Sequence, residues 1–218
     1  MKNKIPKNFD VISSPKTFRV FPTSIFMLMN KDFDKDNKSL IKLINNYKGK
    51  QKSIKKSNYG GYHSSIGIGN LNDFKKIKSK LIDSFAAILS LCYGHECIRD
   101  LKKYKIVKES FECMWFIVNS KNDFNVMHTH PRAWLSCVYY INLPKTTNIL
   151  RFYDPVQARR QDADYCNNTT FIEAKEGSFI FFPAWLEHSV DKNKTNEDRI
   201  IISCNFRKPN FIAKIKEK

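Results

Sequence analysis

After Lys108, apolar residues recur with the period of β-strands instead of the three-to-four-residue period of helices, and this change most constrains the fold. Alternation of apolar and polar residues over short runs indicates half-buried strands. Short connections containing Asn, Asp, Gly and Pro separate the runs, as an antiparallel sandwich or small barrel requires. We predict strands at residues 111–118, 125–129, 133–142, 148–153, 169–173, 178–182 and 199–206.

The front half is predicted to be richer in helices. Apolar residues recur at helical spacing over residues 36–47 and 72–92, and the Asn and Asp that begin the second segment are predicted to cap it. Alternation over residues 15–30 predicts an early strand pair, and Gly60-Gly61 marks a turn before another short strand. We therefore expect one domain over residues 1–218, with a helix-rich part at 1–108 and a β-core at 109–208.

The composition indicates a globular protein. Hydrophobic residues make up 42% of the 218 residues and aromatic residues 13%, so the chain can bury a sizeable core. The sequence contains neither a run of about 18 apolar residues nor a signal-peptide pattern, so we expect a cytoplasmic protein with no membrane partner. The six cysteines form no Cys-x-x-Cys pair, which predicts reduced residues instead of a disulfide frame or a zinc site.

The net charge of +17 raises the alternative of a nucleic-acid-binding module. Lysine dominates the basic residues, however, while arginine, the better reader of bases and phosphates, is scarce. Residues 48–56 would be the best candidate patch, and a solvated loop is the plainer interpretation. Neither a helix-turn-helix nor an aromatic stacking motif supports this alternative, which predicts salt-sensitive binding without metal dependence.

Three of the five histidines, His128, His130 and His188, fall in two segments with strand character, residues 125–143 and 177–190. Side chains two residues apart on a strand point to the same face, so His128 and His130 can both reach one ion. A single strand histidine is more often a hydrogen-bonded core or surface residue, but the three together with Arg199 indicate a metal and cosubstrate site. His63 could line the mouth of its pocket, and we expect His95 to be a capping or loop residue after the second helix.

The pattern His-x-His-Pro, a later His and an Arg eleven residues beyond it resembles the 2-oxoglutarate- and iron(II)-dependent oxygenases. The likeness is fairly specific for a bacterial and phage group of these proteins, and it covers most of the chain. It is carried by residues 115–119, 128–140, 152–155, 177–188 and 199–205, and in the front half by residues 19–24 and 57–64.

The resemblance implies a mostly β fold with flanking helices, in which N-terminal helices accompany a double-stranded β-helix core of the jelly-roll or cupin type. It implies Fe(II) and 2-oxoglutarate as cofactors, held respectively by His128, His130 and His188 and by Arg199. Three protein ligands leave room on the metal for a bidentate 2-oxo acid, and a guanidinium provides a planar fork for its other carboxylate. Ser203 and Asn205 are further cofactor-binding candidates by the same resemblance.

A tyrosine on the strand after the histidine pair could add a hydrogen bond to that carboxylate. Continuing the face of His128 and His130 along an unbroken strand selects Ser136 and Tyr140. A bulge at Pro131 would select Tyr139 instead, so both tyrosines stay candidates.

The sequence departs from the resembled superfamily at position 130, where that superfamily normally has a carboxylate. In one reading His130 is the third ligand of a three-histidine site. In another, Asp154 supplies the carboxylate, unless it only forms a turn before Pro155. In the last, His130 lies behind the ligands and water completes the site, or the metal is not ferrous.

The resemblance implies an oxygenase that hydroxylates a C–H bond of a second substrate and releases succinate and CO2. That substrate could be a small molecule, a protein side chain or a nucleobase. A cupin-like barrel that binds a metal or small ligand without catalysis is an alternative, and so is a three-histidine dioxygenase that does not use 2-oxoglutarate. The three tryptophans are predicted to be core residues.

Overall fold

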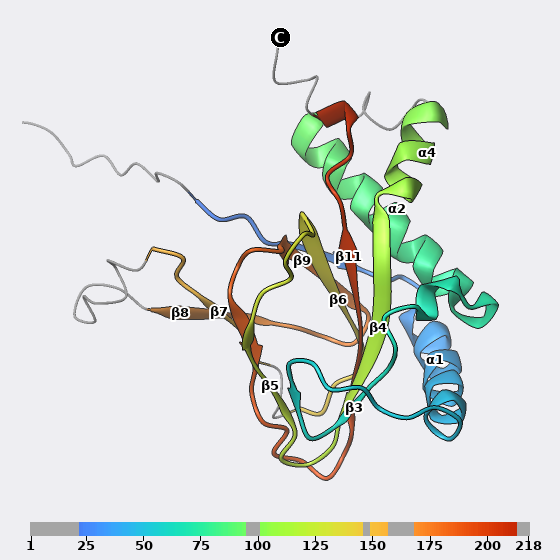
Figure 1. The fold of residues 1–218 in the computed structure, drawn as a ribbon, viewed down its shortest axis with the longest axis vertical. Coiled ribbons are helices and arrows are strands. Elements are labelled where there is room, and N and C mark those ends of the chain that lie inside the picture. Colours follow the sequence, from blue (N-terminus) through green and yellow to red (C-terminus); the bar gives the residue numbers. More distant parts are fainter. Residues whose placement is uncertain (1–21, 95–100, 146–148, 157–167, 213–218) are drawn as a thin grey trace, which may run out of the picture.

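The computed structural model describes residues 22–94, 101–145, 149–156 and 168–212, and two antiparallel sheets dominate it (Figure 1). The larger sheet has the strand order β1-β9-β6-β11-β4-β3 and the smaller one the order β2-β5-β10-β7-β8. The strands are β1 (Phe26–Met29), β2 (Asn58–Tyr59), β3 (Tyr62–His63), β4 (Phe111–Asn119), β5 (Phe124–His128), β6 (Leu135–Asn142), β7 (Ile149–Tyr153), β8 (Thr169–Glu173), β9 (Ser178–Pro183), β10 (His188–Val190) and β11 (Arg199–Phe206).

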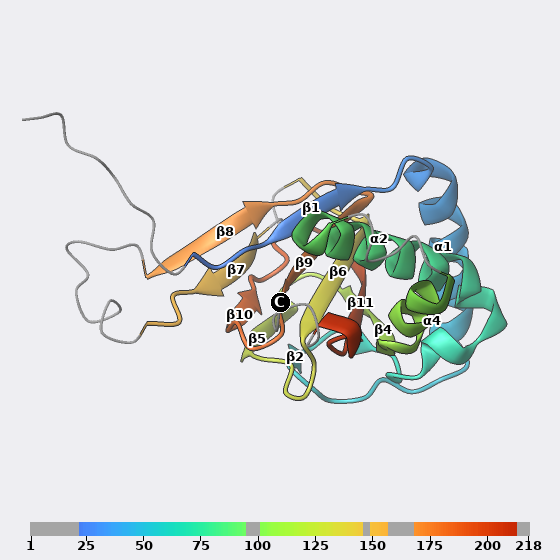
Figure 2. The same ribbon diagram turned by 90° about the horizontal axis from the view of Figure 1, so that it is seen from above.

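Helices cover only one face of the larger sheet. Figures 1 and 2 show α1 (Phe33–Lys48), α2 (Lys75–Tyr93) and α4 (Leu101–Glu109) on the side away from β5, β7 and β10. A large apolar cluster joins α1 and α2 to this face, and a second cluster lies between the two sheets. Because β4, β6 and β11 have helices on one face and a sheet on the other, nearly all their side chains are buried.

The predicted fold class is confirmed: the chain has a mostly β structure of two antiparallel sheets with flanking helices. The seven predicted strands of the C-terminal half are present with bounds that differ by two residues at most. The early strand pair was wrong in part, because β1 pairs with the distant β9. Residues 15–21 lie outside the described residues.

Two details of the helices differ from the prediction. Asn72 and Asp73 do not cap α2; they lie in a short 3-10 turn that leads into it, and no side-chain cap bond is present at its N-terminus. The helix α4 was not predicted, because its nine residues include four lysines and carry a weak apolar pattern. The turn at Gly60 and Gly61 is confirmed, since both have positive φ angles of 69° and 63°.

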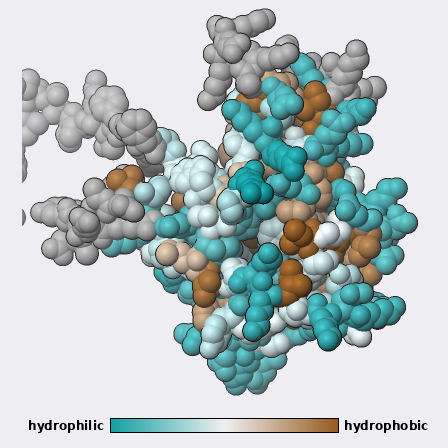
Figure 3. Space-filling model, viewed as in Figure 1, coloured by the Kyte–Doolittle hydropathy of each residue, from teal (hydrophilic) through white to brown (hydrophobic). Residues whose placement is uncertain are grey.

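Four described cysteines, Cys92, Cys113, Cys137 and Cys204, are free thiols, as predicted for them, although Cys92 is exposed and not part of the core. Within the described ranges, none of the helices is long and apolar enough to cross a membrane. In the view of Figure 1 hydrophilic residues cover most of the surface and the apolar patches are small (Figure 3).

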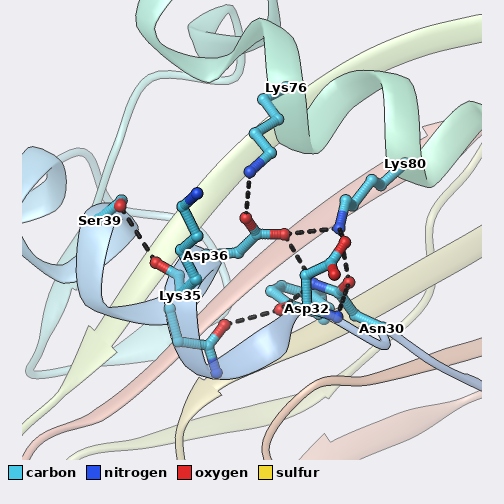
Figure 4. Close-up of polar contacts among 9 residues, drawn as sticks. Asn30, Asp32, Lys35, Asp36, Ser39, Lys76 and Lys80 are labelled. Carbon is cyan, nitrogen blue, oxygen red and sulfur yellow. Dashed lines mark hydrogen bonds and ion pairs between the residues drawn. The ribbon is translucent and has the colours of Figure 1, made fainter.

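A buried carboxylate ties α1 to α2 on the helical side. Figure 4 shows Asp36 between Lys76 and Lys80, with Asn30 donating a third hydrogen bond at 3.0 Å. Burial acts to raise the pKa of Asp36, but the bonds from the two lysines and Asn30 outweigh it and lower this pKa to about 2. The carboxylate therefore stabilises the folded state wherever it is ionised.

We expect Asp36→Asn to lower the free energy of unfolding at neutral pH by about 2 kcal/mol, because the substitution leaves Lys80 without its buried counter-ion. In unfolded chains the pKa of an aspartate is ~3.9, so above that pH the wild type should show its full excess in free energy of unfolding over the variant. This excess should vanish as the pH falls through the folded value of about 2. Urea unfolding over a pH series measures this difference, and Asp34→Asn, an exposed position in the same helical turn, is the control. Equal losses in both variants would contradict the prediction.

Candidate metal and cosubstrate site

A cavity of about 500 Å³ lies between the two sheets and is lined by residues of β4, β5, β10 and β11. Its walls are formed by apolar side chains of the second cluster, including Trp115, Ile117 and Ile201, together with a few polar groups. The polar groups include His63, His128, His130, His188, Ser203 and Asn205. An apolar pocket with a small number of converging polar groups is typical of a ligand site.

The three predicted ligand histidines meet at one wall of this cavity. His128 ends β5 and is paired directly with His188 at the start of β10. His130 does not continue that strand, as the prediction assumed: it lies in the turn between β5 and β6, where its backbone N–H donates to Ala184 O at 2.9 Å. One ring nitrogen from each histidine nevertheless lies within 4.8 Å of the others.

Each of the three imidazoles uses Nδ1 to hydrogen-bond an oxygen. His128 contacts Val126 O at 2.7 Å, His188 contacts Leu186 O at 2.9 Å and His130 contacts Asn205 Oδ1 at 2.8 Å. Carbonyl and amide oxygens only accept hydrogen bonds, so Nδ1 must carry the proton. In a neutral ring the lone pair is then on Nε2, which is left for a metal.

The electrostatics of the cavity keep these rings neutral. Burial lowers the pKa of His188 to about 3, with help from the two neighbouring histidines, and burial lowers the pKa of His130 to about 4. Burial also lowers the pKa of His128. Neutral imidazole is the form that binds a metal, so little deprotonation is needed at neutral pH.

The residues present fit a metal ion. Nitrogen ligands about 2.1 Å from one ion lie roughly 3.0–3.4 Å apart, so the observed cluster needs only small side-chain movements to close around one. Three ligands on one side leave further positions open toward the cavity, which is the arrangement of non-haem iron sites that bind a second molecule. Among the described residues, no carboxylate belongs to the cluster.

Asp154, the alternative third ligand, does not join the histidines. It follows β7, and its Oδ1 accepts a hydrogen bond from the backbone N–H of Val156 at 2.8 Å. This is the geometry of an Asx turn, in which the carboxylate stabilises a local bend, here around Pro155. The structure therefore favours the turn-forming interpretation of Asp154 over its interpretation as a ligand.

Arg199 is the first residue of β11. Its side chain is on the same face of the strand as Ile201, Ser203 and Asn205, which line the cavity. Its side chain is buried, with 2% of its surface exposed, and burial lowers its pKa to about 10. The guanidinium is thus cationic at neutral pH in a position where few charges are tolerated. Such a buried cation beside a cavity is suited to an anionic ligand.

Of the two candidate tyrosines, only Tyr140 lies on the inner face. Tyr140 belongs to the cluster between the sheets, where burial raises the pKa of its hydroxyl while nearby Arg199 acts to lower it. Tyr139 points to the helical side, donates to Asn37 Oδ1 at 2.6 Å and accepts from Asn30. Strand alternation puts them on opposite faces, so the structure does not support Tyr139 as a cofactor-binding residue.

Asn205, a candidate cofactor-binding residue, lies close to the histidine cluster. It faces the cavity, but its Oδ1 is engaged by His130 and by Ser136 Oγ at 2.9 Å. Ser203 lines the cavity and is 4% exposed. The role of Asn205 beside His130 was missed because a hydrogen bond over 75 positions leaves no local signal in the sequence.

The other aromatic and histidine predictions had mixed outcomes. His63 lines the cavity, as suggested, and its ring stacks on Trp115 with centroids 6.0 Å apart. Trp115 is buried and Trp134 packs against the core, but Trp185 is 57% exposed, so its prediction as a core residue was wrong. His95 lies outside the described residues.

Comparison with known proteins finds a family that matches the β-core. Residues 113–205 match the family described as "Putative 2OG-Fe(II) oxygenase". None of the curated proteins matches the sequence significantly.

Solved structures share the fold at low sequence identity. A prolyl-4-hydroxylase from Pseudomonas putida is 12% identical with a TM-score of 0.56, over 85% of this chain and 94% of that one. HygX from Streptomyces hygroscopicus, solved with nickel and 2-oxoglutarate, is 8% identical with a TM-score of 0.57, over 87% and 84%. The non-haem α-ketoglutarate-dependent epimerase SnoN is 10% identical with a TM-score of 0.60, over 88% and 83%. The matched segment runs from Cys113 in β4 to Asn205 in β11, and it contains the three histidines and Arg199. The chain therefore shares the fold of these solved proteins, and its β-core matches the family of putative 2OG-Fe(II) oxygenases.

Proposed function

We propose that this protein binds Fe(II) through His128, His130 and His188 and 2-oxoglutarate through Arg199, and that it hydroxylates a second substrate. The observation that carries the proposal is the meeting of three imidazoles, each with Nδ1 engaged, in a cavity with a buried arginine beside it. The overall reaction is R–H + O2 + 2-oxoglutarate → R–OH + succinate + CO2. The bound iron would supply the activation of dioxygen.

The chain's own residues would hold and orient the reactants. The backbone carbonyls behind His128 and His188 keep both rings turned toward the cavity. Arg199, with the hydroxyl of Tyr140 nearby, would hold the far carboxylate of 2-oxoglutarate. The apolar walls around Trp115 and Ile201 would exclude water from the reacting atoms.

The substrate enters this proposal as a class only, either a small molecule or a protein side chain. Lys56 is the one lysine or arginine among the residues that line the described cavity, and no acidic side chain is among them. The residues that line the cavity therefore provide no acidic counter-charge for a cationic substrate group.

The test is anaerobic titration of the Fe(II)-loaded protein with 2-oxoglutarate while recording its visible spectrum. We expect a charge-transfer band between iron and the keto acid, because both would share one coordination sphere. Iron bound without such a band would overturn the 2-oxoglutarate assignment and favour a three-histidine dioxygenase or a non-catalytic metal site. Failure to bind iron would overturn the metal assignment as well.

A further inference from the structure

We infer that Asn205 is the positioning residue that makes His130 the third metal ligand. This inference rests on the proposed function, because it concerns the same metal site. It assigns to Asn205 a contact with the ring of His130 in place of a contact with 2-oxoglutarate.

The three histidines differ in what holds them. His128 and His188 are the first or last residues of paired strands, and each Nδ1 donates to a backbone carbonyl two residues earlier. A strand position and a hydrogen bond to the nearby backbone therefore orient each of these two rings. His130 lies beyond the end of β5 in a turn, so no strand orients its side chain.

The backbone around His130 is anchored, but this does not fix its ring. His130 N–H donates to Ala184 O, and Trp134 N–H donates to Phe206 O at 2.8 Å, so the turn is held against β9 and β11. The imidazole can still rotate about two side-chain bonds. The ring donates a hydrogen bond from Nδ1 to Asn205 Oδ1, at 2.8 Å.

Asn205 is itself held in place. It is 9% exposed, it lies next to a register shift in the pairing of β11 with β4, and such irregularities re-aim side chains near sites. Ser136 Oγ donates to the same Oδ1 at 2.9 Å, and the Cys113 thiol is in hydrogen-bonding contact with Asn205. An oxygen with two donors aimed at it has a defined position, and hydrogen bonds in such networks reinforce one another.

The consequence for the metal follows from the tautomer. An oxygen acceptor at Nδ1 leaves the lone pair on Nε2 and turns that atom to the other two rings. Without the acceptor, His130 could adopt either tautomer and several rotamers, and binding a metal would have to select one of them. Partners of this kind typically contribute 10- to 100-fold to metal affinity.

The experiment is titration of the purified, metal-free protein with Co(II), followed by its visible absorption, which reports both affinity and the number of ligands. We expect Asn205→Leu, which keeps the volume but lacks the acceptor, to bind Co(II) roughly 10- to 100-fold more weakly. Its spectrum should approach that of His130→Ala. Asn205→Asp restores an acceptor and should bind within about threefold of the wild type or more tightly.

Ser136→Ala is the matched control, since Ser136 shares the acceptor oxygen but does not touch the ring of His130. Its Co(II) affinity should stay within about threefold of the wild type. Thermal unfolding of each metal-free variant separates loss of folding from loss of binding, and Asn205→Ala replaces the leucine variant if that one does not fold.

Either of two results would overturn this inference and leave the proposed function standing. One is wild-type Co(II) affinity in Asn205→Leu. The other is equal weakening in the leucine and aspartate variants, which would indicate that Asn205 acts through packing and not as a hydrogen-bond acceptor. Wild-type protein that binds no Co(II) would overturn the proposed function too, so the two failures are distinguishable.

Discussion

Arg199→Ala is expected to weaken 2-oxoglutarate binding by roughly 100- to 1,000-fold, because a buried charge-assisted pair is lost and the anion then faces an apolar wall. Arg199 is 2% exposed and begins the strand whose inner face lines the cavity. Isothermal titration of the Co(II)-loaded protein with 2-oxoglutarate measures the change. Arg199→Lys should recover part of the affinity, since lysine keeps the charge and loses the planar fork.

The specificity of this effect needs two controls. Co(II) affinity of Arg199→Ala should equal that of the wild type, because Arg199 is not in the histidine cluster. Arg207→Ala removes an arginine just beyond the same strand, where its exposed side chain pairs with Glu112, and should leave 2-oxoglutarate binding unchanged. If Arg199→Ala bound 2-oxoglutarate normally, the far carboxylate would have to be held elsewhere.

We expect His188→Ala to lower the affinity for Co(II) or Fe(II) by at least about 100-fold. This is more than the loss expected when a residue that only hydrogen-bonds a ligand is removed. His188 is the most deeply buried of the three rings and is paired with His128 in the sheet. Without His188 only two imidazole nitrogens of the cluster remain, which is fewer than the three protein ligands of a facial metal site. Anaerobic metal titration measures the change.

The same cavity and the neighbouring turn offer matched controls for this prediction. His63→Ala removes a fourth histidine that lines the cavity but lies outside the cluster, so metal affinity should not change. Asp154→Ala tests the carboxylate alternative directly, and we expect wild-type affinity because its oxygen is engaged in a turn. A large loss in Asp154→Ala with a small one in His130→Ala would reverse our ligand assignment.

Much of the fold could be predicted because it depends on local periodicity. The seven C-terminal strands were evident from alternation of apolar residues, and Thr169–Glu173 and Arg199–Phe206 were predicted with their observed bounds. The start of α2 was predicted less well, since a 3-10 turn replaces the expected cap. Pairing of β1 with β9 joins segments some 150 residues apart, and no local pattern reports that choice.

The candidate site shows the same division. Residue types and spacing alone singled out His128, His130, His188 and Arg199, because imidazoles and a guanidinium are scarce here and suit metal and carboxylate chemistry. Tertiary structure decided which neighbours take part in the site. It turned Tyr139 toward the helices, engaged Asp154 in a turn and brought Asn205 to His130. The physical reason is that hydrogen bonds are directional and short, so they are determined only once the sheets that carry the two partners have packed.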